Sequence, residues 1–284
     1  MGYSTLSLSD HFTASPVAPM PMLGVLANAT SSLRVGTLVL GNDFRRPATL
    51  AKELATLDVI TEGRLEIGIG AGWLPADYDV SGIALESGST RIERLGETLD
   101  VLDGVLRGGP LTYEGRHLAV HDLTSVPACV QQPRPPLLVG GGGARVLRLA
   151  GQKADIVSIN WRLTEGALNT AAVSSGLAHG TNEKLRWVRE GAGDRFPEIE
   201  LHVVAYLTAI VEDRLEGARQ LVAARGVEVD PAAVLDSPHC LVGSVDEVVD
   251  RLEEMRARWG ISYVTVYDRL IEEFAPVVAR LAGR

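Results

Sequence analysis

Short apolar segments alternate with helical patterns along this sequence. The segments that predict strands are residues 5–9, 33–40, 64–70, 136–140, 154–160, 200–211 and 263–267. Strands that alternate with helices are typical of a mixed α/β fold with a parallel sheet. A (β/α)₈ barrel has one strand more than these seven, and its usual length of about 250 residues suits this chain. We therefore expect a TIM-like barrel that lacks its first strand and helix, with an open doubly wound sheet as the alternative.

The segments between these strands contain clear signals for helices and for one hairpin. Pro47 stands at the first position of a helical pattern, where proline is favoured. Ser244 and Glu247 form a capping box ahead of another apolar helical face. Alternating stretches around a Glu-Gly turn predict an inserted hairpin at about 111–123. Because no linker or low-complexity tract divides the chain, we expect a single domain over residues 1–284.

Three glycines at alternate positions end the third predicted strand, in the stretch GRLEIGIGAGWLP. Gly68, Gly70 and Gly72 are not spaced as in a dinucleotide-binding fingerprint, because the third fingerprint glycine would fall at Trp73. Pro75 then stands where the helix of that motif would already be running. The spacing excludes the fingerprint, so something else must lie against this bare backbone.

The composition favours a globular protein whose partner is a small molecule. Of the 284 residues 46% are hydrophobic and 22% are charged, which suits a sizeable core. The net charge of −9 argues against nucleic acid or an anionic membrane surface as partner, because both bind basic faces. Cys129 and Cys240 lack metal-ligand or redox spacing, so we expect buried free thiols. With no leader pattern and no long uncharged run, we expect a cytoplasmic protein.

Two strand ends carry residues suited to chemistry. Ligands of parallel α/β folds bind at the carboxyl ends of the strands. Asp10 and His11 follow the first predicted strand, and the glycines of 140–143 follow the fourth, with Ala144 and Arg145 next in the chain. Consecutive glycines at a helix start expose peptide N–H groups to an anion such as phosphate. The alternatives are a glycine turn that serves packing and a purely structural histidine.

The sequence contains no pattern typical of a metal site or of a side-chain nucleophile. His117 and His121 are four residues apart, but they lie in the predicted hairpin rather than on a helix. No G-x-S-x-G nucleophile elbow is present. We therefore expect no metal, and an imported cofactor fits better than catalysis by side chains alone.

Four stretches carry a more specific pattern: LSLSDHF at 6–12, LRVGTLVLGNDFRRPATLAKELATLDVITEGRLEIGIGAGW at 33–73, STRIERLGETLDVL at 89–102 and PRPPLLVGGGGARVLRLAGQKADIV at 133–157. Together they resemble the bacterial luciferase-like oxidoreductases, most closely the branch that uses coenzyme F420, a deazaflavin. The likeness is dense over residues 3–160 and looser beyond, through GSVDEVVDRLEEM and YVTVY.

The resemblance implies a TIM-like barrel with a tricyclic ring lying across the strand ends. The segment 70–73 would lie near that ring, and a non-prolyl cis peptide is expected close to Val39–Leu40. The turn 141–145 would hold the cofactor phosphate. The implied cofactor-binding residues are Val39, Leu40, Gly70, Ala71, Gly72, Trp73, Gly141, Gly142, Gly143, Ala144 and Arg145.

The resemblance also implies a reaction. His11, with Asp10 beside it, matches the family's strand-end histidine and would donate a proton or orient substrate and ring. The implied activity is hydride transfer between coenzyme F420 and an unidentified small organic substrate. The alternatives are an FMN-dependent monooxygenase on the same barrel and a cofactor-binding protein without catalysis. A homodimer is expected from the family and from the open barrel edge.

Overall fold

The computed structural model describes residues 1–163 and 166–283 and divides them into two compact units. The N-terminal unit consists of Ser4–Gly140 and Lys153–Asp155. The C-terminal unit consists of Met1–Tyr3, Gly141–Gln152 and the chain from Ile156 onward. The single domain expected over residues 1–284 stays a prediction.

Four parallel strands of an eight-stranded sheet belong to the N-terminal unit. They are β1 (Thr5–Leu8), β2 (Arg34–Thr37), β4 (Leu65–Gly70) and β7 (Leu137–Gly141), in this order across the sheet. The strand expected over 33–40 is divided: β2 ends at Thr37, and a non-proline cis peptide joins Leu38 to Val39. Its continuation, β3 (Leu40–Gly41), pairs with the end of β4. The cis bond lies one residue earlier than expected.

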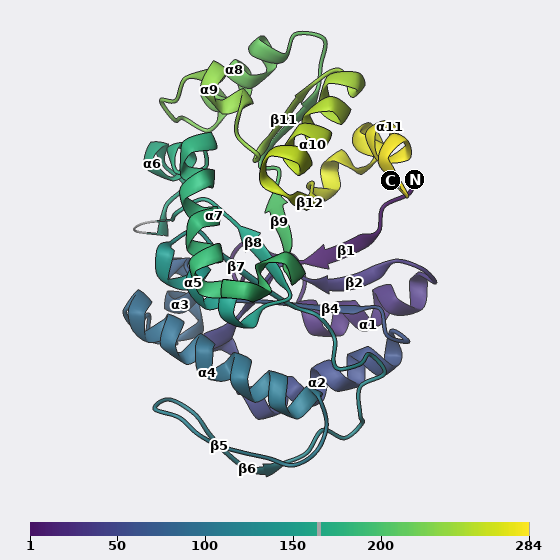
Figure 1. Cartoon of the computed structure of the whole chain (residues 1–284), viewed down its shortest axis with the longest axis vertical. Helices are drawn as coiled ribbons and strands as arrows, with labels where there is room; N and C mark the ends of the chain where they lie inside the picture. The colour runs from purple at the N-terminus through teal and green to yellow at the C-terminus, as the bar shows by residue number, and fades with distance from the viewer. Residues whose placement is uncertain (164–165, 284) are drawn as a thin grey trace. The chain divides into compact units, whose positions relative to one another are not determined.

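Four helices accompany these strands: α1 (Pro19–Ala29), α2 (Pro47–Ile60), α3 (Pro75–Ser81) and α4 (Gly88–Leu106). The first three each begin with a proline in the first turn, where its missing N–H costs no helical hydrogen bond. The start at Pro47 is thereby confirmed. Figure 1 shows α2 running beside α4, and these two helices are in contact, as are α1 and α2.

The inserted hairpin is confirmed and is held to the unit by carboxylates. Its strands β5 (Leu111–Glu114) and β6 (Ala119–Leu123) are antiparallel. Glu97 of α4 accepts hydrogen bonds from three consecutive peptide N–H groups at 116–118, at 2.8 to 2.9 Å. Further along, buried Asp58 of α2 accepts from the peptide N–H groups of Val130 and Gln131. The chain is thus fixed at the hairpin turn and again before β7.

Parallel strands of two sheets form the framework of the C-terminal unit. The strands β8 (Ile156–Ile159), β9 (Glu200–Val204) and β12 (Ile261–Thr265) belong to an eight-stranded sheet, and β10 (Leu207–Ile210) and β11 (Cys240–Gly243) form a separate two-stranded sheet. The single strand expected over 200–211 is therefore wrong. The chain turns at Ala205–Tyr206, where the peptide N–H of Tyr206 bonds to the carbonyl of Val204, and then pairs with a different partner.

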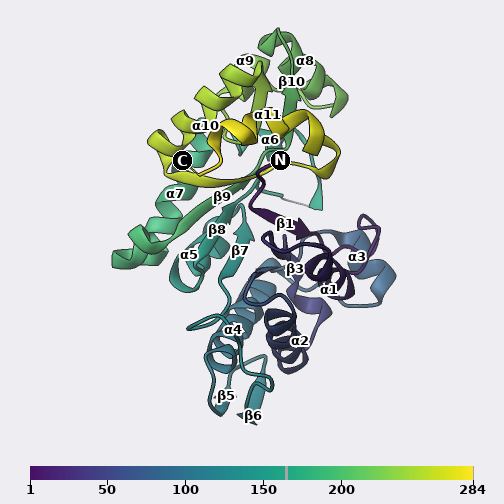
Figure 2. The ribbon, with the colours of Figure 1, turned by 90° about the vertical axis from the view of Figure 1, so that its right-hand side faces the viewer.

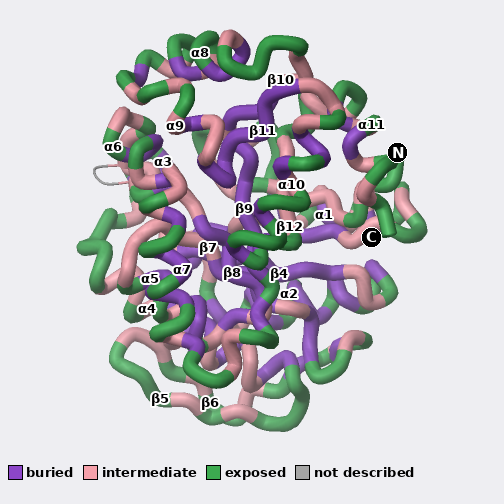
Figure 3. Tube along the Cα trace, turned by 45° about the horizontal axis from the view of Figure 1, so that its top comes forward, coloured by how far each residue is buried: buried purple, intermediate pink, exposed green. Residues whose placement is uncertain are grey.

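The seven strands predicted from the sequence correspond to β1, β2, β4, β7, β8, β9 and β12 within the described residues. Their pairings in the described part of the chain are parallel, and Figure 3 shows that the central strands are largely buried. The short strand β11 escaped sequence analysis because four apolar residues between two helices give no periodicity of their own.

The remaining helices lie in or lead into the C-terminal unit. They are α5 (Ala144–Lys153), α6 (Thr170–Ser174), α7 (Ala178–Ala192), α8 (Arg214–Ala224), α9 (Pro231–Leu235), α10 (Val245–Trp259) and α11 (Ile271–Leu281). The capping box of Ser244 and Glu247 at the start of α10 is confirmed. Figure 2 shows α8, α9 and α10 around the β10–β11 sheet, and all three contact β11. A buried cluster that includes Leu207, Val234 and Val242 joins these layers.

Candidate functional site

His11 forms a short hydrogen bond with a carboxylate that lies 66 residues away in the sequence. Its Nδ1 is 2.5 Å from Oδ2 of Asp77, in the first turn of α3. The other oxygen of Asp77 accepts hydrogen bonds from the peptide N–H groups of Phe12 and Thr13 and from the Thr13 hydroxyl. Asp77 therefore organises the whole turn after β1 from a position that is 2% exposed.

The charges of this pair define what His11 can do. Burial raises the pKa of the Asp77 carboxyl, but the hydrogen bonds from His11 and Thr13 outweigh it, so the net pKa is lowered from its ordinary value of 3.8. Asp77 is therefore ionised at neutral pH. An ionised carboxylate accepts a hydrogen bond from Nδ1–H, which leaves Nε2 as the ring nitrogen that exchanges protons.

Trp73 and Asp10 complete this part of the site in the N-terminal unit. The indole of Trp73 meets the imidazole of His11 edge to face, with ring centroids 5.7 Å apart. The carboxylate of Asp10 pairs with the guanidinium of Arg45 and accepts a 3.0 Å hydrogen bond from the peptide N–H of Gly41. Asp10 thus ties the turn after β1 to the segment after the cis bond.

The glycines of the third strand are required by their protein neighbours. A Cβ on Gly68 would lie 1.9 Å from the carbonyl oxygen of Thr37, and one on Gly70 would lie 2.9 Å from a methyl of Val39. Gly72 has a φ of +75°, and a Cβ there would lie 1.9 Å from the Tyr78 hydroxyl oxygen. Close packing therefore explains the bare backbone by itself, and contact of this segment with a ring stays a prediction.

The turn of Gly141–Arg145 lies in the C-terminal unit, where β7 passes into α5. A Cβ on Gly141 would lie 2.3 Å from Val146, and one on Gly142 would lie 2.2 Å from the carbonyl oxygen of Trp161. At Gly143 no described atom lies within 4 Å of such a Cβ. Packing thus requires two of the glycines, and the third leaves open space at the start of the helix.

Aromatic and amide side chains follow β8 and β9 in the same unit. The hydroxyl of Tyr206 donates to Oδ1 of Asn160 at 2.9 Å, and its ring lies 4.4 Å from that of Trp161. Lys184, almost fully buried, donates from Nζ to the carbonyl oxygens of Asn160 and Ser175. Burial lowers the pKa of Lys184 to about 7.

A fully buried histidine bridges the strands of this unit. His202 of β9 hydrogen-bonds through Nδ1 to the Ser158 hydroxyl of β8 and through Nε2 to the Thr265 hydroxyl of β12, at 2.7 and 2.9 Å. Burial lowers the pKa of His202 to about 3, so this imidazole is neutral. It joins three parallel strands and is not a proton donor at neutral pH.

The predicted residues thus fall into two groups. Asp10, His11, Val39, Leu40 and the segment 70–73 belong to the N-terminal unit, and the turn 141–145 belongs to the C-terminal unit. Sequence reasoning missed Asp77 and Arg45, the ionic partners of His11 and Asp10. The only signal for Asp77 was an acidic residue two positions after Pro75, at the start of a short helix that the sequence analysis did not predict.

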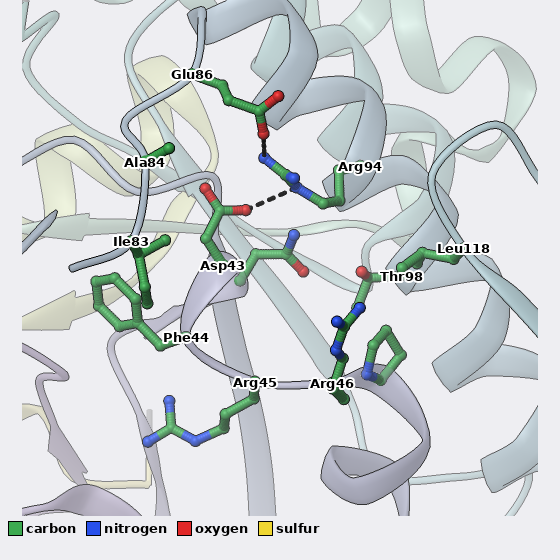
Figure 4. Close-up of a pocket in the computed structure, with 12 residues that line it drawn as sticks. Asp43, Phe44, Arg45, Arg46, Ile83, Ala84, Glu86, Arg94, Thr98 and Leu118 are labelled. Carbon is green, nitrogen blue, oxygen red and sulfur yellow. Dashed lines mark hydrogen bonds and ion pairs between the residues drawn. The ribbon is translucent and has the colours of Figure 1, made fainter. Parts of the chain in front are cut away.

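A cavity of about 370 Å³ in the N-terminal unit is lined by none of the predicted residues. Its walls come from the segment 42–47, the loop 83–86, α4 and the hairpin, as Figure 4 shows. Among residues 1–163 and 166–283, no cluster of histidine, cysteine or acidic side chains could hold a metal ion. None of the helices described there is both long and apolar enough to cross a membrane.

Comparison with known proteins places the chain in a family. Residues 1–233 match the model of the luciferase-like monooxygenases, so the chain belongs to this family. An F420-dependent glucose-6-phosphate dehydrogenase of Microbacterium testaceum is 32% identical over 163 residues, which are 55% of this chain and 47% of the relative. An FMNH₂-dependent dimethylsulfone monooxygenase of Pseudomonas putida is 26% identical over 74% of this chain and 53% of the relative. The chain thus spans about half the length of these curated relatives.

Structural similarity extends over nearly the whole chain. The coenzyme F420-dependent tetrahydromethanopterin reductase of Methanopyrus kandleri superposes with a TM-score of 0.75 at 22% identity, covering 98% of this chain and 89% of the reductase. At this identity the likeness confirms the fold, a mixed α/β barrel of the luciferase-like type. The family includes F420-dependent dehydrogenases and FMN-dependent monooxygenases, and its named members are oxidoreductases.

Proposed function

We propose that this protein is an oxidoreductase that transfers a hydride between coenzyme F420 and a small organic substrate. The observation that supports it most directly is the His11–Asp77 pair beside Trp73, at the ends of β1 and β4. F420-dependent enzymes occur among both the sequence relatives and the structural neighbours. When bound, the deazaflavin would supply a carbon centre that accepts or donates the hydride.

The residues present fit such a cofactor. Gly143 leaves open space at the first turn of α5, where peptide N–H groups favour phosphate. The turn 141–145 would hold the cofactor phosphate, and Val39, Leu40 and the segment 70–73 would lie against the ring. Trp73 is only partly buried and offers a flat apolar wall.

His11 would handle the proton of the reaction. If the reacting carbon of the substrate carries a hydroxyl, oxidation breaks its C–H and O–H bonds and forms a C=O bond. A bound deazaflavin would supply the hydride acceptor, and Nε2 of His11 would accept the proton. Asp77 keeps Nδ1 protonated and stabilises the imidazolium that results. Asp10, whose carboxylate is occupied by Arg45 and Gly41, would position this turn rather than touch the substrate.

Titration with F420 and with FMN in parallel tests the cofactor. We expect saturable quenching of tryptophan fluorescence by F420, and a smaller quench in Trp73→Phe. Turnover should be lost in His11→Ala and kept in His121→Ala, a matched change on the exposed face of the hairpin. Failure of F420 to bind, or full turnover in His11→Ala, would contradict the proposal.

An FMN-dependent monooxygenase is the second candidate, because an FMNH₂-dependent relative matches 74% of this chain. Binding of FMN alone, with oxygen consumption by the reduced complex, would establish it instead. Binding of either cofactor with no turnover of any acceptor would indicate a cofactor-binding protein without catalysis. A homodimer and a cytoplasmic location remain further predictions, and light scattering after gel filtration measures the first.

A further inference from the structure

The cavity of the N-terminal unit contains a buried polar side chain that makes no hydrogen bond. Asn42 is 4% exposed, and neither its amide nitrogen nor its amide oxygen has a partner among the described residues. Thr98 of α4, which is 2% exposed, lines the same cavity of about 370 Å³. Buried polar groups are nearly always satisfied, so the Asn42 amide points to a missing partner.

Asn42 is held in this place by its neighbours. The preceding residue, Gly41, donates its peptide N–H to Asp10. The following residue, Asp43, accepts hydrogen bonds from the Tyr78 hydroxyl and from Nε of Arg94, both at 2.9 Å. The backbone on both sides of Asn42 is therefore anchored, and its amide cannot readily turn out to water.

Two of the three arginines that line the cavity are paired with carboxylates. Arg94 pairs with Asp43 and Glu86, and Figure 4 shows these three side chains meeting on one side of the cavity. Arg45 is occupied by Asp10. Arg46 lies apart from this cluster in Figure 4, and its guanidinium pairs with no carboxylate among the described residues. It is the one arginine of this wall whose charge is not already neutralised.

The start of α2 adds to the same wall. Arg46 is the N-cap of this 14-residue helix, no side chain caps it, and Pro47 follows. The peptide N–H groups of the first turn therefore have no intrahelical acceptor, and the positive end of the helix favours an anion. The remaining wall is apolar, with Phe44, Ile83 and Leu118. The hairpin side of this wall is fixed, because Glu97 binds the peptide N–H of Leu118.

We infer that this cavity, which is lined by none of the residues proposed to touch the cofactor or the substrate, is a second binding site for a small organic carboxylate that also carries an amide group. The carboxylate binds at Arg46 and the start of α2. The amide pairs with Asn42, whose side chain offers one acceptor and one donor site, and a polar atom reaches the Thr98 hydroxyl. The volume lies at the lower end of the range for small-molecule pockets, about 300 to 1,000 Å³.

N-acetylglycine is a small probe with both groups, and NMR of the side-chain amide of Asn42 is the direct readout. The titration is carried out without F420 or FMN, so its result does not depend on the proposed function. We expect a saturable shift of the Asn42 amide resonances. Affinity should fall about tenfold or more in Arg46→Gln, as for loss of a charge-assisted hydrogen bond. Affinity should fall similarly in Asn42→Leu, in which the titration is followed through the backbone amide of Asp43. Arg256→Gln, an exposed arginine of α10, should change nothing.

Two further probes separate the groups of the ligand. N-acetylglycinamide, which lacks the carboxylate, should bind about tenfold more weakly or worse. Inorganic phosphate that binds more tightly than N-acetylglycine would overturn the assignment of the amide. Absence of a saturable shift, or equal affinity in Arg46→Gln and the unchanged protein, would overturn the site. A shift of Asn42 that follows protein concentration rather than probe would show that a second copy of the chain fills the cavity.

Discussion

Replacing Asp77 with asparagine removes its charge and keeps its shape. The carboxylate accepts one hydrogen bond from His11 on Oδ2 and three from Phe12 and Thr13 on Oδ1. If the amide oxygen takes the place of Oδ1, its NH₂ group faces Nδ1–H of His11, and that hydrogen bond is lost. A hydrogen bond to a charged group contributes about 1.5 to 3 kcal/mol, which is the expected loss in the free energy of unfolding at pH 7.

The pH dependence of this loss has a defined sign. The folded pKa of Asp77 is lowered, so its stabilisation is present above the ordinary value of 3.8 and is lost as the pH falls through the folded pKa. The difference in stability between the unchanged protein and Asp77→Asn should therefore shrink as the pH falls below about 3.8.

Urea denaturation followed by circular dichroism measures both effects, with the m-value as a check that only stability has changed. Asp79→Asn is the matched control, because Asp79 lies on the same helix and is exposed. A loss below about 0.5 kcal/mol, the usual range for surface changes, would refute the reasoning. So would an equal loss in the control, or a difference that does not shrink well below pH 3.8.

Three other changes test the framework. Gly68→Ala should destabilise the fold by at least about 1 to 3 kcal/mol, since its Cβ would lie 1.9 Å from a carbonyl oxygen, and thermal unfolding measures this. Between about pH 7 and 10.5, the folded protein binds fewer protons at Lys184 than the unfolded chain does. Over this range the free energy of unfolding of the unchanged protein, compared with that of Lys184→Met, should therefore rise with pH. A flat difference in urea titrations would contradict the burial of that ammonium. Glu97→Gln should speed amide hydrogen exchange at 116–118 in mass spectrometry, with unchanged exchange in β4.

Elements with a strong local signal could be predicted from the sequence. The capping box of Ser244 and Glu247 and the N1 proline of α2 are decided within a few residues, and both are confirmed. The division of 200–211 could not be predicted, because β9 and β10 are both apolar and differ only in their partners, β12 and β11. Strand pairing is a long-range property, and periodicity does not encode it.

The candidate site, too, could be predicted from the sequence only where a residue has a local signal. His11 could be singled out from its position at a strand end, whereas Asp77 has no local signal that distinguishes it from other acidic helix starts. The spacing of Gly68, Gly70 and Gly72 pointed to a close neighbour, and the structure supplies Thr37, Val39 and Tyr78 in that role. Sequence reasoning found that something must approach this backbone but not that it is the protein itself.

The inserted hairpin and the chain that follows it are each held in place by a carboxylate of a helix. Glu97 binds the turn at 116–118, and Asp58 binds the returning chain at Val130 and Gln131, just before β7 pairs with β4. Because the return is fixed independently of what precedes it, the chain between α4 and Val130 can change in length or sequence while β7 keeps its register. Transplanting this segment between members of the family should therefore alter the rim of the 370 Å³ cavity, where Leu118 stands, and leave the strands untouched.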